Sequence, residues 1–298
     1  MNIFRKSWTM LKMLYYFGPK VTAKHIRGVI KNNHFEIIKK EDLDYQIWQK
    51  TVEKKQIDEI KKASVQEDIK ISILMPVYNV EARLLEEAVI SVINQWYTNW
   101  ELCIYDDASS NRETLQKLHE IEEWGDSRIK ISFGKKNGHI SFATNKAAEL
   151  ATGEYLFLMD NDDTIPEHAL KAIAQVINKE SPEIVFYDED KLDFAGRRVE
   201  AIFKPDFSLI TLQSIMYLAH TTIRKDIFDK AGGMRKGFEG SQDYDLILRI
   251  IEKDTKVIHI PQVLYHWRRV PGSTSHAYSD KSYAIDTKLK VVQDYLDR

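Results

Sequence analysis

The chain has 298 residues, of which 43% are hydrophobic, so it can bury a sizeable core in one large domain or in one domain with an extension. A single cysteine, Cys103, excludes an intramolecular disulfide, and its apolar neighbours in "ELCIYDD" favour a buried residue in a reducing compartment. The formal net charge is −2, and nucleic-acid binding is poorly supported because the basic residues cluster near the N-terminus while the rest of the chain is acidic.

Residues 1–34 differ in charge from the rest of the chain. They carry seven Lys or Arg residues and no Asp or Glu, which leaves 36 basic against 45 acidic residues in the remainder. Aromatic residues such as Trp8 lie between these charges. Lys12 and the pair Gly18 and Pro19 interrupt the apolar stretch, which argues against a membrane span of about 20 residues and against a signal peptide. Two interpretations stay open: an interfacial helix on an anionic membrane, and a helix that packs on the main domain.

The next part of the chain, residues 35–66, is charged and helix-prone. Tyr45 and Trp48 stand at helix-like spacing, and we expect a helical linker that packs on the main domain. We therefore divide the chain into a basic amphipathic segment with a helical linker, residues 1–66, and a main domain, residues 67–298.

From Ile71 onward, short apolar runs alternate with amphipathic helical patterns. The runs that predict strands fall within residues 71–79, 101–110, 128–133 and 155–160. The helical patterns fall within residues 81–96, 112–124, 140–151 and 167–179. Strands buried on both faces and separated by helices predict an α/β fold with a mostly parallel sheet and right-handed crossovers.

Three of the predicted strands end in polar residues. Tyr78 and Asn79 follow the first strand, Asp106 and Asp107 follow the second, and the carboxylates of residues 160–163 follow the fourth. Ligands of such sheets bind beyond the carboxyl ends of the strands, so these side chains should converge. A nucleotide suits this edge, because a ring can stack on a base, a carboxylate can accept its imide hydrogen and a metal can carry the phosphates.

Asp160 and Asp162 form an Asp-x-Asp pair at the turn after the fourth strand. This spacing lets carboxylate oxygens meet an octahedral cation while leaving positions for phosphate oxygens, and the cation would neutralise charge on a departing diphosphate. A solvated Asp-rich turn is the alternative explanation for the pair alone.

Five motifs, taken together, resemble the inverting glycosyltransferases of family 2, which have the GT-A fold. The resemblance runs from about Ile71 to Ser275, and the motifs stand in the order that the family has. They are "SILMPVYN", "YDDASS", "NGHISFATNKAAELATGEYLFLMDNDD", "GFEGSQDYDLILR", and "IPQVLYHWR" followed by "GSTS". The last motif is similar to a subgroup found in bacterial polysaccharide and O-antigen assembly.

The resemblance implies a nucleotide-sugar donor site. Tyr78 would stack on the base, and Asp107 would hydrogen-bond it. The residues implied in donor binding are Pro76, Tyr78, Asn79, Asp107, Asn145, Asp160, Asn161 and Arg268.

The resemblance also implies a metal site and a catalytic base. Asp160 and Asp162 would hold Mn²⁺ or Mg²⁺ with the donor diphosphate, and His266 would supply a further metal or diphosphate contact. Asn161 stands where many relatives of the subgroup have His, which leaves both flanking aspartates intact. Asp243 would be the base of the inverting transfer.

The sequence around Asp243 supports this role without requiring it. Ser241 is a plausible N-cap, and Asp243 falls in the first turn of the helix that follows, where the macrodipole favours an ionised carboxylate. The same position would stabilise any helix. An inverting transfer needs one carboxylate opposite the leaving group to take the proton of the acceptor hydroxyl.

Three further parts of the chain carry polar residues of less specific meaning. Residues 188–191 follow an apolar run and either contact the donor sugar or form a charged turn. His220 alternates with apolar residues in "YLAHTTI", and we expect a hydrogen-bonded core histidine. The segment "WRRVPGSTS", which contains Arg268, is interpreted as a lid over the diphosphate or as a loop.

The resemblance, together with these observations, implies a cytoplasmic enzyme that transfers a sugar from a UDP-sugar to a hydroxyl of a bacterial surface glycan or a lipid-linked acceptor. Peripheral contact with the inner face of the membrane stays open. A dTDP-rhamnose donor is the alternative within the class. A sugar-nucleotide pyrophosphorylase would need a Gly-rich basic phosphate loop, which "PVYNVEARLL" does not supply. A catalytically silent nucleotide-binding subunit is the third hypothesis.

Overall fold

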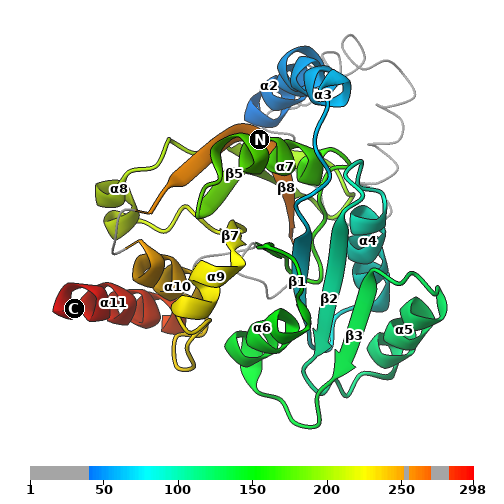
Figure 1. Ribbon diagram of the computed structural model, residues 1–298, viewed down its shortest axis with the longest axis vertical. Coiled ribbons are helices and arrows are strands. Elements are labelled where there is room, and N and C mark those ends of the chain that lie inside the picture. The colour runs from blue at the N-terminus through cyan, green and yellow to red at the C-terminus, as the bar shows by residue number, and fades with distance from the viewer. Residues whose placement is uncertain (1–39, 252–254, 270–281) are drawn as a thin grey trace, which may run out of the picture.

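The computed structural model describes residues 40–251, 255–269 and 282–298 (Figure 1). The basic segment of residues 1–34 therefore lies outside the described residues. In the described part of the chain, eight strands form one sheet, in which β3, β2, β1, β4, β7, β5 and β6 are successive neighbours and β8 pairs with β5. The strands are β1 (Ile71–Val77), β2 (Trp100–Asp106), β3 (Ile129–Phe133), β4 (Tyr155–Leu158), β5 (Ile184–Leu192), β6 (Arg198–Ile202), β7 (Thr222–Arg224) and β8 (Val257–Arg268).

The sheet has a parallel half and a mixed half. β1 pairs in parallel with β2 and β4, and β2 with β3. β7 runs antiparallel to both β4 and β5, and β6 antiparallel to β5, whereas β8 is parallel to β5. The α/β fold expected from the alternating pattern is confirmed. In the mixed half, β5 pairs with three strands, β6, β7 and β8.

Helices cover both faces of the sheet (Figure 1). The helices of the main domain are α4 (Ala82–Ile93), α5 (Arg112–Glu123), α6 (His139–Leu150), α7 (Ala169–Glu180), α8 (Leu209–Ser214), α9 (Lys225–Lys230), α10 (Gln242–Ile250) and α11 (Ser282–Asp297). Ile73 packs into one core with α4, α5 and α7, while its neighbour Leu74 packs into a second core with α6 and α10. Alternate residues of β1 therefore serve opposite cores, which is why its whole run is apolar. Cys103 is fully buried in the second core, as expected.

The helical linker lies against β6, at the top of Figure 1. It consists of α2 (Lys40–Trp48), a π-helical turn η1 (Gln49–Glu53) and α3 (Lys54–Lys62). Tyr45 donates a hydrogen bond of 2.6 Å to Asp190, and Arg198 binds both Asp190 and the buried Glu53. These buried contacts hold the linker on the main domain. Among the described helices, none combines the length and the apolar character needed to cross a bilayer.

Candidate active site

The loops after β1 and β2 are tied together at the carboxyl edge of the sheet. Asn79, which has a φ of 49°, accepts hydrogen bonds from the amides of Ser110 (2.8 Å) and Asn111 (2.9 Å) with its side-chain oxygen. Tyr78 beside it is 51% exposed, so its ring is accessible for stacking. The structure thus brings these two predicted donor-binding residues to the expected edge.

Asp107 is buried and already holds the start of α6. Its carboxylate accepts hydrogen bonds from the amides of Gly138 (2.9 and 3.0 Å) and His139 (2.8 Å). The carboxylate orders the beginning of α6 by accepting from amide groups that lack a partner within the helix. Its contact with a nucleobase stays a prediction.

The carboxylates after β4 lie in very different surroundings. The Asp160 side chain is 52% exposed, whereas Asp163 is fully buried and accepts hydrogen bonds from the Tyr265 hydroxyl (2.7 Å) and the Arg268 amide (2.6 Å). Burial and the neighbouring Asp162 and Asp160 raise the pKa of Asp163 well above its usual value. Burial and Asp160 also raise the pKa of Asp162 to about 6. The turn concentrates negative charge that a cation would stabilise.

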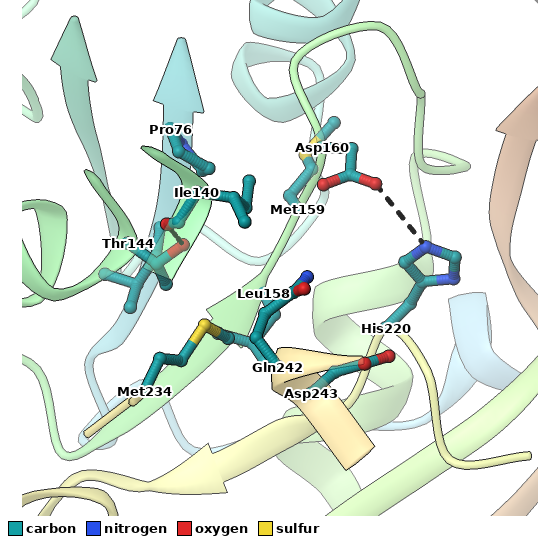
Figure 2. Close-up of a pocket in the computed structure, with 11 residues that line it drawn as sticks. Pro76, Ile140, Thr144, Leu158, Met159, Asp160, His220, Met234, Gln242 and Asp243 are labelled. Carbon is teal, nitrogen blue, oxygen red and sulfur yellow. Dashed lines mark hydrogen bonds and ion pairs between the residues drawn. The ribbon is translucent and has the colours of Figure 1, made fainter. Parts of the chain in front are cut away.

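A histidine that the sequence assigned to the core joins this turn. Nδ1 of His220 lies 2.9 Å from Glu189, so the ring is hydrogen-bonded as expected, but Nε2 lies 3.9 Å from Asp160 (Figure 2). Ligand atoms of Asp160, Asp163 and His220 all lie within 4.8 Å of one another. His220 has a φ of 55°, and its partner Glu189 is 31 residues away, so local sequence gave no signal for this position.

Asp160 and Asp243 line the same pocket (Figure 2). Asp243 lies in the first turn of α10, as predicted, and Ser241 stands at the N-cap position, but its hydroxyl donates to the Gly240 carbonyl and does not cap the helix. Its carboxylate accepts a hydrogen bond of 2.8 Å from the Tyr244 amide, and burial raises its pKa. A raised pKa makes a carboxylate a stronger base. The complete lining is Leu74, Pro76, Ile140, Thr144, Leu158, Met159, Asp160, His220, Met234, Gln242 and Asp243.

Three residues that were predicted to contact the sugar donor form hydrogen bonds with backbone groups at or near the pocket. The Asn145 amide group binds both the N–H (2.9 Å) and the carbonyl (2.8 Å) of Met234, which lines the pocket. Asn161 donates to the Pro76 carbonyl (2.5 Å). Arg268 donates to the carbonyl of Asp162 (2.6 Å) and pairs with Glu87. Direct contacts of these side chains with a donor stay predictions.

His266 is placed apart from the Asp160 cluster. Its Nδ1 lies 2.6 Å from Asp190. The same carboxylate binds Tyr45 of the linker and Arg198 of β6. The backbone of His266 pairs with Thr164, just after the carboxylate turn. The structure does not bring the His266 ring together with Asp160 and Asp163, and its role as a metal contact stays a prediction. Glu189 and Asp190 are neighbours in β5 but bind different groups.

Comparison with known proteins identifies the family. The family model "Glycosyl transferase family 2" matches residues 72–230, more than half of the chain. An uncharacterised protein of Sinorhizobium fredii, y4gI, is 40% identical over 76% of this chain and 25% of its own length. The O-antigen biosynthesis protein RfbC of Myxococcus xanthus is 32% identical over 76% of this chain and 18% of its own length. The chain therefore spans a quarter or less of these two relatives.

Solved structures show the same fold. The crystal structure of S. aureus TarS in complex with UDP-GlcNAc superimposes with a TM-score of 0.63 at 19% identity, over 76% of this chain and 66% of that chain. The TarS complex with UDP gives a TM-score of 0.57 at 18% identity, over 77% and 71%. Since the family model covers more than half of the sequence and the fold agrees, this chain belongs to glycosyl transferase family 2.

Proposed function

We propose that the protein transfers a sugar from a UDP-sugar to a hydroxyl group of a bacterial surface glycan or lipid-linked acceptor, with inversion at the anomeric carbon. The observation that supports this proposal is that Asp160 and Asp243 line one pocket, so that a proton acceptor and a turn suited to a diphosphate-bound cation would lie together. The UDP-GlcNAc complex of TarS supports a UDP-sugar donor, and the name of RfbC supports a surface-glycan acceptor.

A divalent cation fits the residues after β4. Asp160, Asp163 and His220 offer two carboxylates and one imidazole nitrogen within 4.8 Å, a donor set that suits Mn²⁺ and, through its oxygens, Mg²⁺. We propose that Asp160 holds the ion and that Asp162 joins it when the donor is bound. The cation would stabilise the negative charge of the departing diphosphate.

The protein's own residues supply binding and proton transfer. Tyr78 stacks on the uracil ring, and Asp243 accepts the proton of the acceptor hydroxyl as its oxygen attacks the anomeric carbon. The bond between that carbon and the diphosphate oxygen breaks on the opposite side, so UDP leaves with the bonding electrons and the configuration inverts. The raised pKa of Asp243 favours this proton transfer.

The test is a calorimetric screen of nucleotide sugars, with and without Mn²⁺, followed by measurement of donor hydrolysis. We expect Mn²⁺-dependent binding and slow hydrolysis of at least one UDP-sugar. Preference for dTDP-rhamnose in the same panel would identify the alternative donor class. Binding without hydrolysis or transfer to any acceptor would instead support a silent subunit.

A further inference from the structure

We infer that His220 binds the divalent cation of this site directly and that Glu189, Lys204 and Tyr265 are the positioning residues that aim its ring. The inference rests on the proposed metal dependence and adds residues that the Asp-x-Asp motif does not contain. It also replaces the interpretation of His220 as a core histidine. Four observations carry it: the two ring nitrogens, the ring face, and a comparison with two other histidines.

The first ring nitrogen of His220 is held by a buried carboxylate. Glu189 is 5% exposed and lies 2.9 Å from Nδ1. Glu189 pairs with the buried ammonium group of Lys204 at 3.2 Å, which identifies it as a carboxylate that accepts hydrogen bonds. Nδ1 therefore carries a hydrogen, and in the neutral ring the lone pair is on Nε2.

Lys204 keeps Glu189 in place and balances its charge. The Lys204 side chain is 2% exposed, and its amino group lies 3.2 Å from Glu189 and 3.3 Å from the Ala219 carbonyl, one residue before His220. A carboxylate that binds the outer nitrogen of a metal-bound histidine is the usual partner that fixes its tautomer and orientation. Glu189 and Lys204 supply this arrangement around His220.

The second ring nitrogen faces the pocket. Nε2 of His220 lies 3.9 Å from Asp160 Oδ2 (Figure 2), too far for a hydrogen bond. Two ligand atoms that bind one small divalent ion at about 2.1 Å each can lie up to roughly 4.2 Å apart. The observed separation suits a shared ion better than a direct contact.

One side chain contacts all three members of the cluster. The Tyr265 ring stacks on His220 with a centroid distance of 3.8 Å and an interplanar angle of 6°. Its hydroxyl donates to Asp163 (2.7 Å) and accepts from the amide of Asp160 (3.0 Å). Tyr265 thus fixes the plane of the imidazole relative to the carboxylate turn.

Two other histidines whose side chains are largely buried also have carboxylate partners, but neither has such a position. His259 has both ring nitrogens on carboxylates, at 2.9 Å from Asp188 and 3.1 Å from Asp206, and stacks on an aromatic ring as His220 does. His266 lies against Asp190, away from the pocket lining. Of these three, His220 has a ring nitrogen directed at a pocket carboxylate. His259→Gln is therefore a matched control, and His266→Gln tests the ligand expected from the sequence.

The experiment uses the full chain with Mn²⁺ and UDP. Pulsed electron paramagnetic resonance detects ¹⁴N nuclei bound to Mn²⁺. Replacing a residue that has only a structural role would leave this ¹⁴N coupling unchanged. We expect this ¹⁴N coupling in the wild type, its loss in His220→Gln, and its retention in His259→Gln and His266→Gln. Titration of the free Mn²⁺ signal should show affinity for Mn²⁺ weaker by about 10- to 100-fold in His220→Gln.

Glu189→Gln tests the positioning role. It should weaken Mn²⁺ binding by about tenfold or more while the ¹⁴N coupling persists, because His220 is still present. This change leaves buried Lys204 without its charge partner and can lower stability, so thermal unfolding is measured for every variant. His220→Gln leaves the pair of Glu189 and Lys204 intact and stays interpretable if Glu189→Gln does not fold.

Three results would overturn the inference, and they are distinguishable. If the wild type binds Mn²⁺ with UDP and His220→Gln keeps both the affinity and the ¹⁴N coupling, His220 is not a ligand, although the proposed function stands. Loss of the coupling in His266→Gln alone would assign the ligand to His266. If the wild type binds no Mn²⁺ in the presence of UDP, the metal dependence in the proposed function fails, and this inference fails with it.

Discussion

Burial and a neighbouring charge both change the acidity of Asp162, in the turn after β4. Burial and the proximity of Asp160 raise the pKa of Asp162 to about 6, so ionising Asp162 costs more than ionising an exposed carboxylate, and a nearby cation would offset that cost. We predict that Asp162→Asn lowers kcat/KM by roughly 100-fold or more, since a cation contributes several kcal/mol to the transition state. Excess EDTA should have the same effect on the wild type. Asp58→Asn, on the exposed face of α3, is the control. Full activity in excess EDTA would show that sugar transfer requires no divalent metal.

Asp243 should affect turnover and leave donor binding intact. A base acts on the acceptor proton in the transition state, so Asp243→Asn should lower kcat by roughly 10² or more. Calorimetry with UDP should give nearly the wild-type affinity, and Asp229→Asn, on the exposed surface of α9, should change neither value. Lost UDP affinity in Asp243→Asn would instead assign this carboxylate to the nucleotide site or to the fold.

At the scale of elements, a buried carboxylate joins strands at the end of the sheet opposite the pocket. Glu101 of β2 accepts from Ser72 of β1 (2.7 Å) and from the Thr152 amide after α6 (2.5 Å), and pairs with Lys130 of β3 (2.8 Å). Burial alone would raise the pKa of Glu101, but these partners lower it to about 2. Ionised Glu101 therefore stabilises the contacts between three strands and α6.

This lowered pKa predicts a stability that depends on pH. Because the pKa is below its unfolded value of 4.5, the stabilisation is fully present above pH 4.5 and is lost as pH falls toward 2. Glu101→Gln should lower the free energy of unfolding at pH 7 by about 2–3 kcal/mol and flatten its decline in acid. Urea unfolding from pH 7 to pH 3 measures both effects. Glu149→Gln, whose side chain is 62% exposed, should keep the wild-type profile.

The parallel half of the fold could be predicted from sequence, and the mixed half could not. The apolar run of β1 requires burial on both faces, and α10 begins where Ser241 and Asp243 indicate. By contrast, the pairing of β5 with β6, β7 and β8 depends on contacts between distant segments. For the same reason local patterns could not show that His220 turns toward Asp160, or that His266 turns toward Asp190.

At the scale of the whole molecule, the uneven charge of the sequence leads to a membrane prediction. Residues 1–34 carry seven basic residues and no acidic ones, whereas the remainder has an excess of acidic residues that an anionic surface would repel. Each basic residue near such a surface contributes about 1 kcal/mol, so partial engagement would give reversible attachment near a lipid-linked acceptor. We predict that the full chain sediments with anionic vesicles at low salt and less so at high salt.

The matched comparison is a chain that starts near Phe35, on anionic and neutral vesicles. It should sediment less than the full chain on anionic lipid, and neither should sediment strongly on neutral lipid. Equal sedimentation of both chains on anionic vesicles would remove the proposed role of residues 1–34.

The position of β5 limits how this fold can be altered by insertion or deletion. Glu189 serves the pocket through His220, and its neighbour Asp190 holds the linker through Arg198. One added or lost residue within β5 would turn each carboxylate toward the other's partners, because side chains alternate along a strand. The same change in the turn at Gly196 would leave both carboxylates in register with β8. Length variation between related chains should therefore collect at this turn, while β5 keeps its length wherever linker and pocket are both retained.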